Sequence, residues 1–364
     1  MNWKPFLLPA LPALLLFAGA CSTGSGISAF SPFPSPQEQT KQQKPQIYLY
    51  ATGEGIIDKT KANEEKALQK VKQILKTEPV FSNLAEIHFV HPFHLNGKKI
   101  TGADWLKLAR NIQATLDKPE VSGIVITHDL SSLEDTAYFL NLLIRSDKPI
   151  VLVKTISPVK TVTTESIMNF YNALAAAASP DSRGMGVLVS MNDTLYAARD
   201  AAGAPSGSTE IFRGGEYGPL GFVINGKPQY YHKTTRRHTT LTEFDLASIR
   251  ELPRIRTTYL YADNSPQEIL TWLKEGVKGI VVDCSGEGIL KPAVRNALKE
   301  AVKKGVVVVL SSRTGSPADI KDEELRKNVV LDSSLTPQKA GILLMLALTQ
   351  TSDPAKIQEY FNHY

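Results

Sequence analysis

Short apolar runs alternate with amphipathic stretches along the chain from about residue 46 to the carboxyl terminus. Runs rich in Val, Ile and Leu predict buried strands at 47–51, 121–126, 149–154, 185–190, 255–260, 277–282 and 305–310. Apolar residues at helical spacing predict helices at 103–115, 133–145, 166–178, 266–275, 291–303 and 337–349. Such alternation is typical of an α/β protein with a doubly wound, mostly parallel sheet.

Two segments interrupt this alternation. Residues 217–233 predict a hairpin, because two short apolar runs flank an Asn225-Gly226 turn. Residues from Lys233 to about Leu252 are polar and predict a linker. With 364 residues, two domains are the default. We expect a larger N-terminal domain at 46–235, a linker at 236–252 and a smaller C-terminal α/β domain at 253–364.

The first 21 residues have the pattern of an export signal rather than of a folded element. Lys4 precedes an apolar run, Phe6–Ala20, that is too short for a stable membrane span. The run ends in Ala18-Gly-Ala-Cys21, which resembles the site where lipoprotein signals are cut before a cysteine that receives lipid. Ser22 after that cysteine favours the outer membrane. We expect export and a lipid anchor on Cys21 at the periplasmic face of the outer membrane; the alternative is an ordinary signal peptide cut nearby.

The residues that follow are rich in Ser, Pro, Gln and Gly and show no apolar period. This composition predicts a disordered tether at 22–45. If Cys21 carries lipid, Cys284 is the one cysteine left, which excludes an intrachain disulfide and a thiolate metal site. We expect Cys284 to be a small buried residue rather than a nucleophile.

Composition changes this picture little. Apolar residues make up 42% and charged residues 21% of the chain, as in ordinary globular proteins. The net charge of +5 includes no long block of Lys and Arg, so nucleic acid is not an expected partner.

One stretch combines a buried strand, a polar turn and a helix. The strand at 121–126 runs into Thr127–Ser132, and an apolar helical stripe begins at Leu133. Ser131 stands three residues before Glu134, the spacing of a capping box. Ligands bind at the carboxyl edge of parallel sheets, so this turn is the expected place for chemistry.

The same stretch resembles a known active-site segment. Thr127-His128, followed by Glu134-Asp-Thr-Ala-Tyr-Phe-Leu140, is similar to the second active-site segment of bacterial periplasmic-type (type II) L-asparaginases. Further matches follow in order at Asp147–Val153, Met168–Leu174, Arg183–Val189, Met191–Thr194, Ala198–Asp200, Tyr217–Gly221, Ile224–Lys227, Phe244–Asp245, Glu251–Pro253, Ser311–Arg313 and Ile357–Tyr364. The resemblance covers residues 46 to 364. It implies a two-domain fold and a homo-oligomer, a tetramer built from intimate dimers whose subunits share active sites.

The resemblance also implies where the catalytic groups of that family belong, and this chain differs at each place. The nucleophilic threonine of the first segment corresponds to Gly55, and the second Thr-Asp pair corresponds to Leu130 and Ser131. The catalytic lysine falls at about Gly203. A tyrosine-bearing lid is missing after the first segment, and Pro92–Leu95 stands where the family binds the carboxylate of its substrate.

We therefore expect an envelope lipoprotein of asparaginase fold without amidohydrolase activity, acting as a binding or interaction module. The alternative is an active L-asparaginase or related amidohydrolase that converts asparagine to aspartate and ammonia.

The residues now present at the former pocket suggest three hypotheses; the set is Thr52, Glu54, Gly55, Asp129, Leu130, Ser131 and Lys154. In the first, Glu54 and Asp129 pair with Lys154 and fill the cleft. In the second, the two carboxylates favour a small amine or amide ligand. In the third, Ser131 or Ser132 is a nucleophile with Lys154 as its base. Helix capping is the commoner use of serines at such positions.

Histidines suggest no metal centre. His128 is structural in the family that the chain resembles, and we expect it in the core. His88, His91 and His94 are three residues apart, but residues 86–90 alternate like a strand and Pro92 intervenes. No metal or cofactor is predicted, and the membrane is expected as a partner only through the lipid anchor.

Overall fold

The computed structural model describes residues 43–52, 69, 72–73, 75–90, 100–154, 164–203, 212–284, 290–312, 320 and 322–364. The chain divides into two compact units, residues 1–43 and residues 44–364. The second unit holds the elements discussed below. The predicted signal peptide, Cys21, most of the predicted tether, Glu54, Gly55, His91, His94 and the segment 92–95 lie outside the described residues.

The larger domain is built on an eight-stranded sheet with the order β10-β9-β6-β5-β4-β3-β1-β2. Strands β2 to β5 and β1 run parallel, whereas β6, β9 and β10 extend the sheet through antiparallel pairs. The strands are β1 (Gln46–Ala51), β2 (Glu86–Val90), β3 (Val121–His128), β4 (Ile150–Lys154), β5 (Val187–Met191), β6 (Thr194–Ala197), β9 (Gly221–Ile224) and β10 (Lys227–Tyr230).

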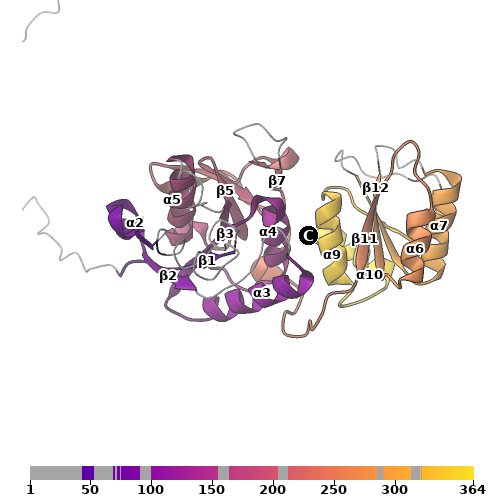
Figure 1. Cartoon of the computed structure of the whole chain (residues 1–364), viewed down its shortest axis with the longest axis horizontal. Coiled ribbons are helices and arrows are strands. Elements are labelled where there is room, and N and C mark those ends of the chain that lie inside the picture. Colours follow the sequence, from indigo (N-terminus) through magenta and orange to yellow (C-terminus); the bar gives the residue numbers. More distant parts are fainter. Residues whose placement is uncertain are drawn as a thin grey trace, which may run out of the picture. The chain divides into compact units, whose positions relative to one another are not determined.

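Helices cover both faces of this sheet (Figure 1). Helices α3 (Gly102–Leu116) and α4 (Leu133–Leu143) pack with one apolar cluster, and α2 (Pro79–Leu84) and α5 (Thr164–Ala178) pack with the other. Successive residues of β3 alternate between the two clusters, Ile124 and Ile126 facing one and Val125 the other. The strand reads as a continuous apolar run because both of its faces are buried.

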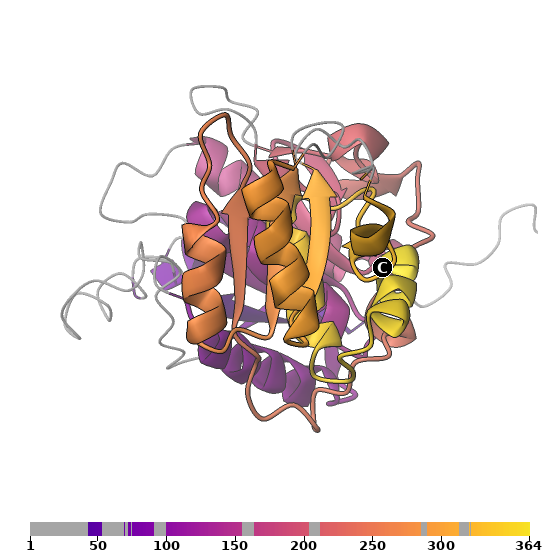
Figure 2. The ribbon, with the colours of Figure 1, turned by 90° about the vertical axis from the view of Figure 1, so that its right-hand side faces the viewer.

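The smaller domain has a four-stranded parallel sheet, β11 (Ile255–Tyr259), β12 (Gly279–Cys284), β13 (Val307–Ser312) and β14 (Val330–Leu331). Helices α6 (Gln267–Lys274) and α7 (Pro292–Lys303) cover one face, which Figure 2 shows toward the viewer. Helix α9 (Pro337–Ala347) packs on the other face and also contacts α4 of the larger domain. The remaining helices are α8 (Glu323–Arg326) and α10 (Pro354–His363).

The predicted fold class is confirmed: the protein has a larger, mostly parallel sheet domain with a hairpin and a smaller α/β domain. The hairpin turn lies at Asn225 and Gly226, whose φ values of 51° and 73° are those that a two-residue turn of this kind needs. A second hairpin was not predicted. It joins β5 to β6 through Asn192 and Asp193, which adopt φ values of 47° and 60°.

The segment predicted as a linker is packed rather than loosely solvated. Between β10 and β11 the one described helical element is a 3-10 turn, Thr239–Leu241. Phe244 is fully buried and Ile249 is 2% exposed. Thr242 Oγ1 donates to the carbonyl of Leu142, and Arg237 N donates to the carbonyl of His363. The segment is therefore held to elements of both domains.

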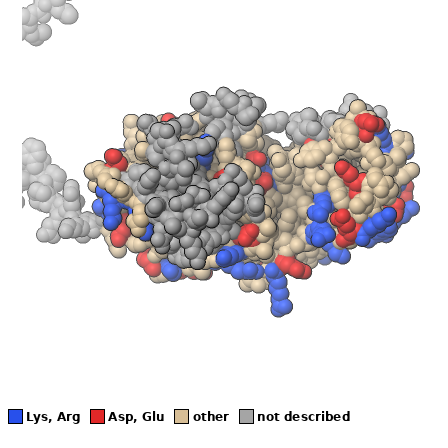
Figure 3. Space-filling view, in the orientation of Figure 1, with Lys and Arg blue, Asp and Glu red and all other residues tan. Residues whose placement is uncertain are grey.

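The distribution of charged side chains and the length of the helices agree with the composition. Lys and Arg side chains lie interspersed with Asp and Glu over the visible described surface in Figure 3. Within the part of the chain that the structure describes, no helix is both long and apolar enough to span a bilayer.

Candidate functional site

The carboxyl ends of three adjacent strands bring the predicted site residues together. In the sheet, β1 lies beside β3 and β3 beside β4. Ala51 is in register with Thr127, and His128 with Lys154. Thr52, Asp129 and Lys154 therefore lie at neighbouring strand ends, where parallel sheets bind ligands.

His128 is the centre of a buried hydrogen-bond network at this edge. Its side chain is fully buried, and Nδ1 contacts the hydroxyl of Thr52, which itself donates to the carbonyl of Thr127 at 3.0 Å. Because the Thr52 proton is used on that carbonyl, Nδ1 donates to Thr52. Nε2 then accepts from the hydroxyls of Ser132 and Thr136, both at 3.0 Å. The expectation of a core histidine is confirmed.

Burial fixes the charge of this imidazole. Desolvation lowers the pKa of His128 to about 4, although the nearby carboxylate of Asp129 opposes the shift. The ring is thus neutral at physiological pH, and its one N–H proton and its one nitrogen lone pair are used to hold the turn after β3.

Replacing His128 with Asn is expected to make the free energy of unfolding fall less steeply as the pH becomes acidic. The folded wild type binds fewer protons at this site than the unfolded chain between about pH 6.5 and pH 4. Wild-type stability therefore falls as the pH drops through this window, by about 3 kcal/mol from this group. Urea unfolding of both proteins at about pH 7 and pH 4.5 measures how much unfolding free energy each loses between the two pH values. Groups other than residue 128 contribute equally to both losses, so the difference between the proteins reports on His128. Equal losses in the two proteins would contradict the assignment.

The turn after His128 is organised by Asp129 rather than by the predicted capping box. The Asp129 carboxylate accepts from the backbone N of Ser131 at 3.0 Å and from its hydroxyl at 2.7 Å. Helix α4 begins at Leu133, and Ser132 at the N-cap position makes no side-chain cap bond because its hydroxyl faces His128. The Ser131–Glu134 capping box was therefore wrong: the aspartate competes successfully for the Ser131 groups.

Within the described residues, the contacts that two hypotheses gave to Lys154 can be compared with the structure in part. Its side chain is exposed at the end of β4. Among the described residues it forms no ion pair with Asp129 and no hydrogen bond to Ser131 or Ser132. Pairing with Glu54 lies outside the described residues. The structure thus gives no support to a serine nucleophile that uses Lys154 as its base, since such a base must reach the hydroxyl proton.

Leu130 is half-buried and packs against the apolar cluster below α4. An aliphatic side chain has no proton to donate and no lone pair, so this position of the turn contributes packing alone. Phe93, which belongs to the segment Pro92–Leu95 named above, lies outside the described residues.

The segment around Gly203 is anchored without a lysine of its own. Gly203 belongs to β7 (Ala202–Gly203), which pairs with β8 (Phe212–Arg213). Its backbone N donates to Glu134 Oε2 at 3.0 Å, so the carboxylate proposed for a capping box instead fixes this strand to the start of α4.

A buried polar cluster between the two domains, absent from the sequence-based predictions, anchors the segment before Gly203. Lys339 of α9 is 1% exposed, and its Nζ donates to the carbonyls of Arg199 and Ala201. Desolvation lowers the pKa of Lys339 to about 8 and, together with Glu134, raises that of Asp135 to about 6. A signal for it existed in the sequence: a lysine one turn into an otherwise apolar helix.

Arg199 completes this cluster. Its side chain is 5% exposed and donates to Tyr364 O at 3.0 Å, to Asp200 Oδ1 at 2.8 Å and to Ser334 Oγ at 2.6 Å. Tyr364 and Ser334 belong to the smaller domain, so this guanidinium joins the two domains next to the candidate site.

The other candidate ligands and nucleophiles have structural roles. His88 Nε2 bonds Gln46 Oε1 at 2.6 Å, and its ring stacks on Tyr48. No three His, Cys, Asp or Glu side chains gather as a metal site within the described ranges. Cys284 is fully buried, and burial raises the pKa of its thiol to about 12. The expectation of a small buried cysteine is confirmed.

Comparisons with known proteins agree with this architecture. Residues 46–236 match the family described as "Asparaginase, N-terminal", and residues 254–361 match "Glutaminase/Asparaginase C-terminal domain". L-asparaginase 2 of Bacillus subtilis is 36% identical over 99% of this chain and 100% of its own length, and L-asparaginase 2 of Escherichia coli is 36% identical over 88% and 93%. The crystal structure of a probable cytoplasmic L-asparaginase from Campylobacter jejuni matches with a TM-score of 0.77, 35% identity, and coverage of 88% of this chain and 100% of that one. This chain therefore belongs to the asparaginase family.

Proposed function

We propose that the protein is an asparaginase-family scaffold without amidohydrolase activity that binds a small ligand at the carboxyl edge of its larger sheet. The observation that carries this proposal is the set of side chains at that edge. Leu130, Ser131 and Gly203 stand where the family resemblance places a threonine, an aspartate and a lysine, and Gly55 stands at its first threonine. Acyl transfer needs a hydroxyl together with a base that reaches its proton.

The described hydroxyls at the edge support this proposal. Thr52 is buried and bonded to His128 and Thr127. Ser131 is exposed, but its partner Asp129 also accepts from the Ser131 backbone N, which is the geometry of an Asx turn. The hydroxyls thus shape the turn instead of being presented to a substrate.

The ligand that fits this edge best carries an amine. Asp129 is half-buried and unpaired by any described cation, and Glu54 stands two residues after Thr52 in the sequence. Two carboxylates repel the α-carboxylate of a free amino acid and attract an ammonium group. Asparagine amide and putrescine, which lack a free carboxylate, are therefore expected to bind better than asparagine.

Calorimetric titration with asparagine amide, putrescine and asparagine tests this proposal, and proton NMR of the same samples reports any conversion of asparagine to aspartate. We expect the two amines to release or absorb heat on binding to the wild type and to give no such heat with Asp129→Asn. We expect the NMR spectra to show no conversion of asparagine. Absence of binding by either amine would refute the ligand class, and formation of aspartate would refute the loss of hydrolysis.

We also propose that the protein is exported and anchored by lipid on Cys21, on the strength of Lys4, the apolar run and Ala18-Gly-Ala-Cys21. Cys21→Ser is expected to abolish incorporation of radiolabelled palmitate and to move the protein from the membrane to the soluble fraction. Cys284→Ser is the matched control, since Cys284 is buried and cannot be acylated in the folded protein. Undiminished labelling of Cys21→Ser would contradict the anchor.

A second function has one observation in its favour, the names of the relatives. Several related proteins are named L-asparaginase or glutaminase-asparaginase. An active enzyme here would need another residue set, for which Ser131 and Asp129, 2.7 Å apart, are one described pair whose hydroxyl belongs to an exposed residue. Asp129→Asn and Ser131→Ala would then each abolish ammonia release, whereas our proposal predicts no release to abolish.

A further inference from the structure

We propose that a groove beside the edge strand β2 is a binding site for a small anionic amphiphile, a molecule with a phosphate or carboxylate head and an apolar body. The groove has a volume of about 550 Å³, within the range of small-molecule sites. None of its lining residues belongs to the candidate site at the carboxyl edge, so the inference does not depend on the proposed function. Its lining residues are Lys44, Lys72, Leu75, Lys76, Ser82, Ala85, Glu86, Ile87 and Phe89.

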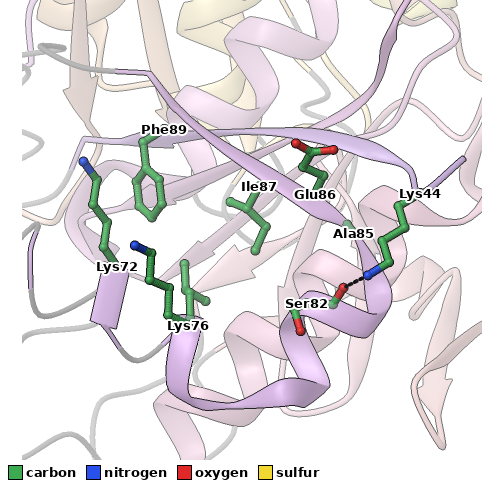
Figure 4. A pocket seen from close by; sticks show the side chains of 9 residues that line it. Lys44, Lys72, Lys76, Ser82, Ala85, Glu86, Ile87 and Phe89 are labelled. Atoms are coloured by element: carbon green, nitrogen blue, oxygen red, sulfur yellow. Dashed lines mark hydrogen bonds between the residues drawn. The ribbon is translucent and has the colours of Figure 1, made fainter.

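Three lysines stand around this groove (Figure 4). Lys72 and Lys76 are four residues apart on a helical segment and lie at the end where Phe89 stands, while Lys44 lies at the other end. The Lys72 ammonium is 5.3 Å from the centroid of the Phe89 ring, a cation–π distance. This contact holds the ammonium over the groove while leaving its protons free for a ligand.

These ammonium groups lack carboxylate partners among the described residues. Lys44 donates to the carbonyl of Ser82 at 2.8 Å, which uses one of its three protons. The one carboxylate in the lining, Glu86, accepts from Gln46 Nε2 at 3.0 Å instead of pairing with a lysine. Three cations thus face the groove against one anion, which favours a ligand carrying negative charge.

The floor of the groove is apolar. Ile87 and Phe89 alternate with Glu86 and His88 on β2, so both face the cluster that packs under α5. Each is half-buried rather than covered, and buried Leu75 together with Ala85 continues the surface. An apolar body laid here would remove this surface from water, which a compact inorganic anion cannot do.

The combination of a basic rim with an apolar floor selects the ligand class. A free phosphate would use the rim alone, and a neutral hydrocarbon would use the floor alone. A single-chain phosphate such as decyl phosphate can use both, with its head between Lys72 and Lys76 and its chain along Ile87.

Calorimetric titration of the purified protein with decyl phosphate, below its critical micelle concentration, tests the site. We expect saturable binding, and a Kd raised about tenfold in the double variant Lys72→Gln, Lys76→Gln, since exposed charges each contribute modestly to binding. The matched control is Lys303→Gln, Lys327→Gln, which removes two exposed lysines of the smaller domain and is expected to leave Kd unchanged.

Two comparison ligands test the basic rim and the apolar floor separately. Decanol and inorganic phosphate are each expected to bind more than tenfold more weakly than decyl phosphate. Phe89→Ser is expected to weaken decyl phosphate while leaving inorganic phosphate unaffected. Equal affinity of the two double variants would overturn the assignment of the rim, and phosphate binding as tight as decyl phosphate would overturn the assignment of the floor.

Discussion

Arg199→Met is expected to lower the free energy of unfolding by about 3–5 kcal/mol, a large effect for a single substitution. The guanidinium is 5% exposed and makes three hydrogen bonds, one to each of Asp200, Ser334 and Tyr364. Methionine fills a similar volume but donates none of them. Asp200, whose side chain is 11% exposed, would then be left as a largely desolvated carboxylate without the Arg199 guanidinium.

Urea unfolding at neutral pH measures this effect, with Arg250→Met as the matched control. Arg250 is exposed, and its replacement is expected to change stability by less than about 0.5 kcal/mol. Since two partners of Arg199 lie in the smaller domain, we also expect the variant to lose the single cooperative transition. A loss below about 1 kcal/mol would show that the cluster does not hold the domains together.

The fold was predictable from the sequence because the smaller sheet and the central part of the larger one are parallel and buried. A strand such as β12 begins with the apolar run Gly279–Val282, and the helix after it shows a clear stripe. What escaped prediction was short or depended on distant partners. The β5–β6 hairpin turns on Asn192-Asp193, whose left-handed conformation carries a weaker signal than Asn225-Gly226.

The sequence predicted where the residues of the candidate site lie on the sheet, but it did not predict their hydrogen-bond partners. Strand ends locate Thr52, Asp129 and Lys154 correctly, because register in a parallel sheet follows from the apolar pattern. The partner of each side chain does not follow from it. Ser131 could bond the helix start or Asp129, and Lys339 meets Arg199 only after the two domains pack.

The second large expected effect is on the rate of amide hydrolysis. In hydrolases that use a hydroxyl nucleophile with a base, loss of the nucleophile alone costs about a million-fold in rate, or about 8 kcal/mol. We propose that Gly55, Leu130, Ser131 and Gly203 stand in place of the nucleophile, both members of the second pair and the lysine that the family resemblance implies. Effects of residues that act as a unit do not add, so we expect loss of the whole family rate rather than a product of factors.

A variant that carries the side chains implied by the family resemblance tests the same idea by a gain of activity. Gly55→Thr, Leu130→Thr, Ser131→Asp and Gly203→Lys together are expected to raise ammonia release above that of the wild type. Gly203 tolerates a side chain, because an added Cβ would meet no described atom within 4 Å. No gain in a variant that folds normally would show that other changes at this edge also block the reaction.

Ammonia release from asparagine and glutamine, measured on purified wild-type protein beside L-asparaginase 2 of Escherichia coli, tests the central claim most directly. We predict a rate equal to that of a buffer blank while the relative turns over under the same conditions. Turnover of about one per second or faster would contradict the claim that this scaffold has lost the chemistry of its family.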